Sequence, residues 1–283
     1  MKFGKLIPKK VVIEPTTRCN ASCVYCGNKA VPKMDMPLDL YKAIIDASPF
    51  AKRIDPVSRG EPLMYPHIVE AVEYAAQKGK QVVMHTNGSM MNGEMALALM
   101  RAGLHMIVFS VDEMEKEPYE KIRQGLDFDE ITKNIEIFQY LRNFHRFKTE
   151  TRVRICHMKE NSDRIKEIFL HWMLHVDSVT TGRELHIMSK EEICLQPYRF
   201  NDNPLKCGEV ETSLAIRPDG TVVLCCSDWY DNYAIGKIGL DVTERQLIDI
   251  FNNELANAIR HGMRTGEFVP QICATCKGRS GTR

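Results

Sequence analysis

The stretch Cys19-Asn-Ala-Ser-Cys23-Val-Tyr-Cys26 places three cysteines within eight residues, directly after the first predicted strand at Val11–Glu14. Three thiolates on one turn can bind three irons of a [4Fe–4S] cube and leave the fourth iron open. Zinc in a structural site requires four ligands, and no histidine stands near this stretch to supply the fourth. The spacing therefore predicts an iron–sulfur cluster with one open iron.

Short β-like runs alternate with helix-length amphipathic segments up to about residue 182, a pattern typical of βα units on a parallel sheet. Strands are predicted at Val11–Glu14, Arg53–Val57, Gln81–Thr86, Met106–Val111, Thr151–Cys156 and Ser178–Thr181. Helices are predicted at Leu38–Ser48, Pro66–Gln77, Gly93–Arg101, Phe128–Phe144 and Arg164–Leu174. Six units are too few for a closed eight-stranded barrel. We therefore expect an α/β fold over residues 1–182, a partial (βα)6 TIM-like barrel with its site at the strand C-termini.

The pattern changes after this barrel. An irregular linker is predicted over residues 183–204 and a second domain over residues 205–283. In that domain Ser213–Arg217 and Thr221–Leu224 flank Pro218-Asp219-Gly220, a strong hairpin signal. A single amphipathic helix is predicted at Thr243–His261, and Cys273-Ala-Thr-Cys276 follows it. We expect a small hairpin-plus-helix iron–sulfur module.

The charge balance and the cysteine content of the sequence indicate which kinds of binding partner and which cellular compartment to expect. The 283 residues contain 38 Lys and Arg against 37 Asp and Glu, with no block of like charge, so nothing favours nucleic acid or a membrane over a small neutral or mixed-charge partner. Met1 to Pro15 holds too short an apolar run for a secretory signal, and no run reaches the ~18 apolar residues of a spanning helix. Ten cysteines without an export signal indicate a cytoplasmic protein whose thiols bind metal.

A second group of cysteines falls in the smaller module. Its members are Cys207, Cys225, Cys226, Cys273 and Cys276. The Cys-x-x-Cys pair supplies two ligands on one turn, the hairpin places one of the tandem cysteines, and Cys207 enters from the preceding loop. Four thiolates close a site, for which a structural zinc is the alternative to an iron–sulfur cluster.

The first cysteine stretch, with aromatic Tyr25 before its last cysteine, resembles the signature of radical S-adenosylmethionine (SAM) enzymes. The resemblance implies a [4Fe–4S] cluster on Cys19, Cys23 and Cys26 whose free iron binds the amino and carboxylate groups of SAM. It also implies that the reduced cluster cleaves SAM to a 5′-deoxyadenosyl radical that abstracts a substrate hydrogen. A flavodoxin- or ferredoxin-type protein is the implied electron donor.

The resemblance continues at successive strand ends. Arg59-Gly60-Glu61-Pro62 looks like the family's Gly-Gly-Glu-Pro motif, whose Glu receives the methionine amino group, although Arg59 replaces the first glycine. Ser110 and Asp112 suit the ribose, and Arg154 suits the SAM carboxylate. The implied SAM-binding set is Tyr25, Gly60, Glu61, Pro62, Thr86, Asn87, Ser110, Asp112 and Arg154. Taken singly, these residues also fit plain turns, a helix entry or a surface ion pair.

The second cysteine group resembles the twitch module, the shortened relative of the SPASM domain. That resemblance implies one auxiliary [4Fe–4S] cluster on Cys207, Cys225, Cys273 and Cys276, because a full SPASM domain needs seven cysteines for two clusters and this module has five. Cys156 and Cys194 are predicted to be buried small apolar side chains.

The tandem cysteines suggest a reaction. If Cys225 and Cys226 lie on an extended strand, they point to opposite faces, and a ligand at Cys225 turns Cys226 toward the barrel mouth. A thiol there can return hydrogen to a carbon radical from the opposite side, which inverts the stereocentre. The sequence therefore predicts a radical SAM epimerase with Cys226 as hydrogen donor.

Two rivals stay open. One is a radical SAM dehydrogenase that oxidises a secondary alcohol, with the auxiliary cluster as electron acceptor and Asp228 or a histidine as base. The other is a zinc ribbon built by Cys23/Cys26 with Cys273/Cys276. The absence of a long N-terminal extension favours a sugar- or aminoglycoside-type substrate over a ribosomal peptide.

Overall fold

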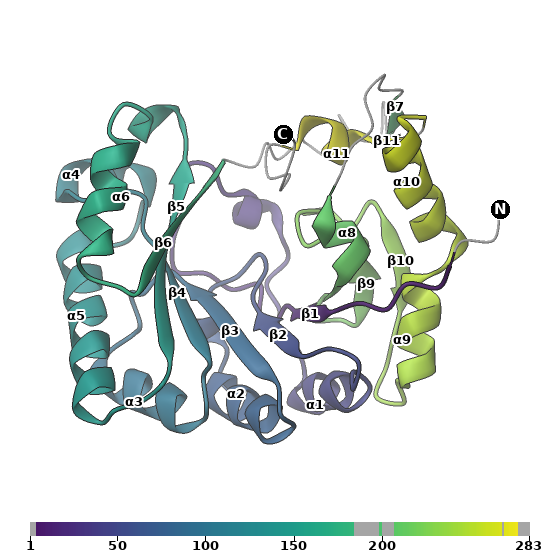
Figure 1. Ribbon diagram of the computed structural model, residues 1–283, viewed down its shortest axis with the longest axis horizontal. Helices are drawn as coiled ribbons and strands as arrows, with labels where there is room; N and C mark the ends of the chain where they lie inside the picture. The colour runs from purple at the N-terminus through teal and green to yellow at the C-terminus, as the bar shows by residue number, and fades with distance from the viewer. Residues whose placement is uncertain (1–3, 184–197, 200–206, 268, 277–283) are drawn as a thin grey trace.

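The computed structural model describes residues 4–183, 198–199, 207–267 and 269–276. Within these ranges the main feature is a curved nine-stranded sheet in the order β10-β9-β8-β1-β2-β3-β4-β5-β6 (Figure 1). None of the helices in the described ranges combines the length and apolar character needed to cross a bilayer.

The six predicted barrel strands are confirmed to within two residues at each end. Each pairs in parallel with the next along the chain. Their bounds are β1 Lys10–Ile13, β2 Arg53–Pro56, β3 Gln81–Thr86, β4 Met106–Ser110, β5 Glu150–His157 and β6 Ser178–Arg183. Because all six run the same way, their C-terminal ends meet at one rim, which we call the barrel mouth.

The five predicted barrel helices are also present and cover the outer face of the sheet (Figure 1). They are α1 Leu38–Asp46, α2 Ile68–Gln77, α3 Gly93–Arg101, α5 Phe128–Phe144 and α6 Ile165–Met173. Val11 and Ile13 belong to the same buried cluster as Tyr41 and Ile44 of α1, while Val12 belongs to a separate cluster. The main core therefore lies between the sheet and its helices, and Val12 marks the inner face.

Several short elements were not predicted. Helix α4, Lys116–Ile122, is polar and buries only Tyr119 and Ile122, so it shows little periodicity. Three 3-10 turns, η1 Gly27–Ala30, η2 Pro62–Met64 and η3 Lys159–Asn161, follow β1, β2 and β5.

The C-terminal hairpin extends the barrel sheet. Strand β8, Ser213–Ile216, pairs in parallel with β1, and β9, Thr221–Val223, pairs antiparallel with β8. Strand β10, Ala234–Lys237, completes that edge. Gly220 turns the hairpin with φ +84°, where a Cβ would lie 2.3 Å from the Ile238 carbonyl oxygen. The predicted module is thus hydrogen-bonded to the barrel.

The remaining elements surround this hairpin. Helix α8, Gly208–Thr212, precedes β8. The two-residue strand β11, Val269–Pro270, pairs with β7, Tyr198–Arg199. Helix α11, Gln271–Thr275, follows β11. Most of the predicted linker, with Cys194, lies outside the described residues. The division into domains at residues 182 and 205 stays a prediction.

The single helix predicted at Thr243–His261 is wrong. The chain forms two helices, α9 Glu244–Phe251 and α10 Glu254–Thr265. The Asn253 side chain accepts a hydrogen bond from the Ala256 amide at 2.8 Å and so caps a new helix, while Asn252 accepts one from the Leu6 amide at 2.8 Å. Asparagine capping breaks a segment whose apolar spacing continues across the break.

Candidate active site

The loop of residues 19–26, which we call the cysteine loop, is fixed to the turn after α4 by its backbone. The Ser22 amide donates to the Gln124 carbonyl at 2.8 Å, and the Val24 amide donates to the Ile122 carbonyl at 3.0 Å. On its other side, the Asn28 side chain donates to the Arg59 carbonyl at 2.6 Å. The loop is therefore held between the segments that follow β2 and β4 at the barrel mouth.

The three thiols of this loop suit a cubane cluster. Cys19, Cys23 and Cys26 are half-buried, and burial raises the pKa of all three, that of Cys19 to about 11. Soft thiolates on one loop are the ligands that such clusters take. The cluster would supply the electron that cleaves SAM, and these three side chains would hold it.

Among the described residues, no three His, Cys, Asp or Glu side chains gather closely enough to hold one metal ion. A zinc ribbon from Cys23, Cys26, Cys273 and Cys276 requires such convergence. In a cubane each cysteine binds a different iron, so convergence on one point is not required.

A buried cation braces the cysteine loop. Arg123 donates to the Asp112 carboxylate at 2.7 Å, and the Tyr25 hydroxyl donates to the same oxygen at 2.9 Å. The other Asp112 oxygen accepts from the Cys156 amide at 2.7 Å, and Asp112 is fully buried. These contacts favour a bracing role for Asp112 over the predicted ribose contact. Sequence reasoning missed Arg123, for which no motif gave a signal.

The motif after β2 packs directly on Thr16 and Arg18, just before the cysteine loop. A Cβ on Gly60 would lie 2.2 Å from the Thr16 carbonyl oxygen, so only glycine fits there. The Glu61 amide donates to the Arg18 carbonyl at 2.8 Å. Pro62 opens the η2 turn, which the Glu61 side chain caps. The predicted SAM motif thus lies against the segment that leads into the cysteine loop.

Glu61 also joins this motif to the end of β3. Its carboxylate accepts from the Thr86 hydroxyl at 2.6 Å and from the Asn87 amide at 2.7 Å, and burial raises its pKa. The Asn87 side chain in turn donates to Asn20 of the cysteine loop at 2.9 Å. Glu61 and Asn87 therefore join three segments: the motif after β2, the end of β3 and the cysteine loop. Its contact with the SAM amino group stays a prediction.

Ser110 and Arg154 are register partners on β4 and β5. Val153 and Ile155 belong to the helix-covered core, so the Arg154 side chain lies on the inner face. Its guanidinium lies over Gly182 of β6, where a Cβ would stand 2.4 Å from Nη2. Arg154 is exposed, and within the described part of the chain its side chain forms no hydrogen bond or ion pair. This arginine is available for an anionic ligand.

Replacing Arg154 with alanine is expected to weaken SAM binding roughly 10- to 100-fold, because one charge-assisted bidentate contact is lost. Both clusters should load normally, since Arg154 supports no other side chain. Arg152→Ala is the matched control: it lies on the same strand and face but donates to Ser178 at 2.9 Å. Equilibrium dialysis with labelled SAM measures the difference. Equal affinities for the two variants would remove the assignment.

The predicted auxiliary ligands lie in the C-terminal part of the main core. Cys273 is buried there, and Cys207 and Cys225 pack against the same core. Cys207 directly precedes α8 and Cys276 directly follows α11. Cys273 is among the neighbours that raise the pKa of Cys225, after its hydrogen bond with Cys226 and its burial. The donor set is thiol-rich, as an iron–sulfur cluster requires.

The tandem cysteines do not lie on a strand as predicted. Strand β9 ends at Val223, and Cys225 and Cys226 form a turn in which the Asp228 amide donates to the Cys225 carbonyl at 3.1 Å. The two thiols share a hydrogen bond, which lowers the pKa of Cys226 to about 7. Their packing still differs: Cys225 joins the main core, whereas Cys226 packs on the inner-face cluster of Val12, Ala215 and Val223.

Asp228 is fully buried and organises the same turn. Its carboxylate accepts from the Tyr233 amide at 2.7 Å and from the Asn232 amide at 3.1 Å. Burial raises its pKa. These contacts favour a structural role over the predicted catalytic base.

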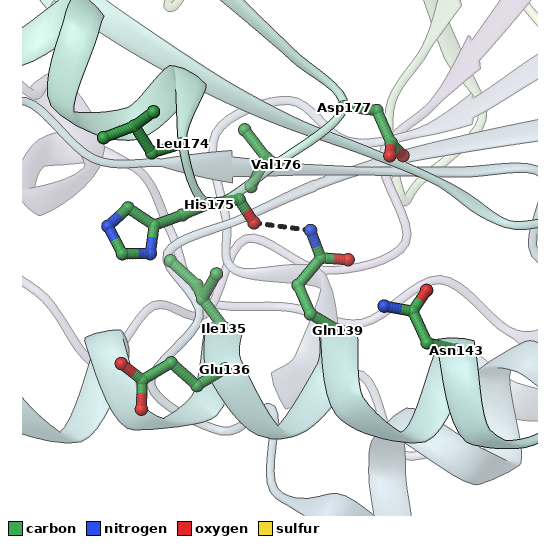
Figure 2. A pocket seen from close by; sticks show the side chains of 8 residues that line it. All are labelled: Ile135, Glu136, Gln139, Asn143, Leu174, His175, Val176 and Asp177. Carbon is green, nitrogen blue, oxygen red and sulfur yellow. Dashed lines mark hydrogen bonds between the residues drawn. The ribbon is translucent and has the colours of Figure 1, made fainter.

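A separate pocket of about 450 Å³ lies between α5 and the segment before β6 (Figure 2). Figure 2 shows the Gln139 amide reaching the backbone of His175, where it donates to the carbonyl at 2.5 Å, while the His175 ring points away from it. None of the predicted site residues lines this pocket, so we do not assign the reaction to it.

Comparison with known sequences agrees with this arrangement. The Radical SAM superfamily profile matches residues 13–169, more than half of the chain, and the SPASM iron–sulfur cluster-binding domain profile matches residues 207–277. An AdoMet-dependent heme synthase from Methanosarcina barkeri is 32% identical over 120 residues, covering 41% of this chain and 34% of the relative. The chain thus spans about a third of that relative.

Two further likenesses run nearly the full length. A tungsten-containing aldehyde ferredoxin oxidoreductase cofactor-modifying protein from Pyrococcus furiosus is 25% identical over 96% of this chain and 88% of its own. BtrN, solved with AdoMet and 2-DOIA, has a TM-score of 0.60 at 15% identity, covering 96% of this chain and 94% of BtrN. The enzyme anSMEcpe with bound AdoMet has a TM-score of 0.68 at 15% identity, over 96% and 92%. The structural likenesses show the shared fold.

Proposed function

The chain belongs to the radical SAM superfamily, and from that premise we propose that it is an epimerase that inverts a carbon stereocentre of its substrate. It carries an auxiliary iron–sulfur cluster domain as well as the SAM cluster. The observation that supports epimerisation is the position of Cys226, whose side chain packs on the inner-face cluster of Val12, Ala215 and Val223. Hydrogen return requires a thiol on that face.

In this proposal Cys19, Cys23 and Cys26 would hold the SAM cluster, which together with bound SAM would supply the radical chemistry that removes one hydrogen atom from the substrate carbon. The Cys226 thiol then donates its hydrogen atom to the opposite side of that carbon. A C–H bond forms, the S–H bond breaks, and Cys226 is left one electron and one proton short. An electron from a flavodoxin- or ferredoxin-type donor and a proton from water restore the thiol.

The protein's other residues in this scheme bind and orient. Arg154 and Ser110 would hold SAM from the inner face, and Glu61 would hold its amino group. Arg123 places a buried positive charge beside the cysteine loop, which favours the negatively charged cluster over empty thiols.

Oxidation of a secondary alcohol is the second candidate. The hydrogen bond between Cys226 and Cys225 favours it, because it holds the Cys226 sulfur close to a predicted auxiliary ligand rather than free at the barrel mouth. In that reaction the substrate radical would lose one electron to the auxiliary cluster and one proton to a base. The protein would need no thiol donor.

The substrate belongs to the proposal as well. We propose a sugar- or aminoglycoside-type molecule, which suits a chain with a formal charge of +1 and no block of like charge. A ribosomal peptide is the alternative. The test panel therefore contains both classes.

Deuterium tracing distinguishes the two reactions. The loaded enzyme is incubated in deuterated water with SAM, dithionite and a panel of aminoglycosides and peptides. An epimerase gives a product with one deuterium at the inverted carbon, because the thiol proton exchanges with solvent before it is donated. A ketone product without solvent deuterium at carbon establishes the dehydrogenase and contradicts the epimerase.

A further inference from the structure

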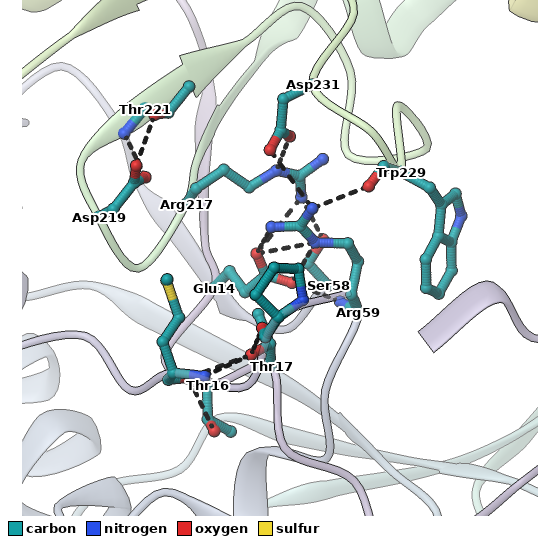
Figure 3. A network of polar contacts seen from close by, with 12 residues as sticks. Glu14, Thr16, Thr17, Ser58, Arg59, Arg217, Asp219, Thr221, Trp229 and Asp231 are labelled. Atoms are coloured by element: carbon teal, nitrogen blue, oxygen red, sulfur yellow. Dashed lines mark hydrogen bonds and ion pairs between the residues drawn. The ribbon is translucent and has the colours of Figure 1, made fainter. Parts of the chain in front are cut away.

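A buried ion pair links the end of β1 to the loop after β2. Arg59 occupies the position of the SAM motif's first glycine, and its guanidinium binds Glu14 through two nitrogens, with Nη2 2.7 Å from Oε2 and Nε 3.0 Å from Oε1 (Figure 3). The Arg59 amide also donates to Glu14 at 2.8 Å. Glu14 is fully buried and Arg59 is nearly so.

The same guanidinium reaches the turn that carries the tandem cysteines. Its Nη1 donates to the Trp229 carbonyl at 2.8 Å and lies 3.4 Å from the Asp231 carboxylate. A second buried arginine, Arg217, runs alongside it, as Figure 3 shows, with Nε 2.7 Å from Asp231 and Nη1 3.6 Å from Glu14. Arg59 and Arg217 each lie between the carboxylates of Glu14 and Asp231. The formal charges of these four side chains cancel.

Arg217 closes the network at both ends. Its Nη1 donates to the Ser58 hydroxyl at 2.7 Å, in the loop after β2, and its Nη2 donates to the Asp228 carbonyl in the turn. Asp231 adopts φ +58°, a left-handed conformation that aspartate enters more readily than most non-glycine residues. The network thus contacts the 225–231 turn at three positions, 228, 229 and 231.

Such a network contributes mainly to the relative orientation of the segments that it joins, and less to the stability of the fold. Well-packed apolar side chains often stabilise a core as much as a buried ion pair does, whereas bidentate arginine contacts fix direction. At one end of the network Arg59 is covalently followed by Gly60 and Glu61 of the SAM motif. At the other end lie Cys225 and Cys226.

We propose that Arg59 is a positioning residue that couples the SAM-binding loop to the auxiliary-cluster turn through Glu14, Arg217 and Asp231. Glycine at this position makes none of these side-chain contacts. The role depends on the two cofactor sites and not on which reaction the enzyme performs.

The test uses the full chain loaded with both clusters and no substrate. Arg59→Lys keeps the charge but loses the planar fork, and Asp231→Asn removes the charge at the other end. Both variants should fold and load iron normally, yet amides 228–233 should exchange with deuterium roughly tenfold faster or more. The reduced auxiliary cluster should also show a changed electron paramagnetic resonance spectrum and midpoint potential.

Arg53→Lys is the matched control, because Arg53 forms a bidentate pair with Asp55 on β2 and, among the described residues, makes no hydrogen bond or ion pair with the 225–231 turn. It should leave both readouts unchanged. Unchanged exchange and an unchanged spectrum in Arg59→Lys and Asp231→Asn would overturn the proposal. So would faster exchange throughout the chain together with a general loss of thermal stability, since that result shows a purely structural role. If Arg59→Lys fails to fold, Asp231→Asn decides, because its side chain is 32% exposed.

Discussion

Replacing Cys19, Cys23 and Cys26 together with alanine is expected to abolish SAM cleavage completely. Without these thiolates no iron is held beside the SAM motif, so bound SAM receives no electron. The iron content should fall from about eight to about four per chain, because the auxiliary cubane remains. Chromatography of 5′-deoxyadenosine and iron and sulfide assays measure the two effects.

The converse variant provides the control. Cys207→Ala should lose the auxiliary cluster and destabilise the C-terminal part of the chain, because metal binding there contributes to folding. The SAM cluster should stay in place and cleave SAM, although the turn at 225–231 is expected to loosen. A protein with zinc and no acid-labile sulfide would contradict both cluster assignments.

The barrel was predictable from sequence because its signals are local. Strands such as Gln81–Thr86 are short apolar runs bounded by turn residues, and helix Phe128–Phe144 begins at a strong cap, Asp127, whose side chain accepts from the amides of Asp129 and Glu130. The motif residues follow strand ends, so the topology brings them to one rim. Gly60 lies against Thr16 and Arg18, just before the cysteine loop, as that topology requires.

The charged contacts were not predictable because they span long stretches of sequence. Glu14 and Arg59 are 45 positions apart, and Arg59 and Trp229 are 170 apart. A single sequence gives no sign that such residues meet. Arg59 therefore registered only as a departure from the family motif, and Arg123 did not register at all.

Local competition explains the two mistaken elements. The apolar spacing of Leu247, Ile250 and Leu255 continues through Asn252 and Asn253, so periodicity alone predicts one helix where asparagine capping makes two. The tandem cysteines directly follow the predicted hairpin strand Thr221–Leu224, and this position favours an extended conformation for them. The Asp228 carboxylate instead accepts from the amides of residues 232 and 233 and stabilises a turn.

Cys226→Ala is expected to abolish epimer formation while SAM cleavage continues. The variant still holds both clusters, so the 5′-deoxyadenosyl radical still removes a hydrogen atom from the substrate. The substrate radical then has no hydrogen donor on the opposite side. Deuterium placed at the substrate carbon should therefore still appear in 5′-deoxyadenosine, and no inverted product should carry solvent deuterium.

Cys156→Ala is the matched thiol control. Cys156 also lies toward the inner face at the end of β5, because Val153 and Ile155 on the same strand face the helix-covered core. Its backbone amide donates to Asp112, a contact that alanine keeps. If Cys156→Ala lost epimerisation and Cys226→Ala kept it, the hydrogen donor would be on β5. If both variants still formed the inverted product, neither thiol would be the hydrogen donor. If both instead gave a ketone without solvent deuterium, oxidation with the auxiliary cluster as acceptor would be the reaction.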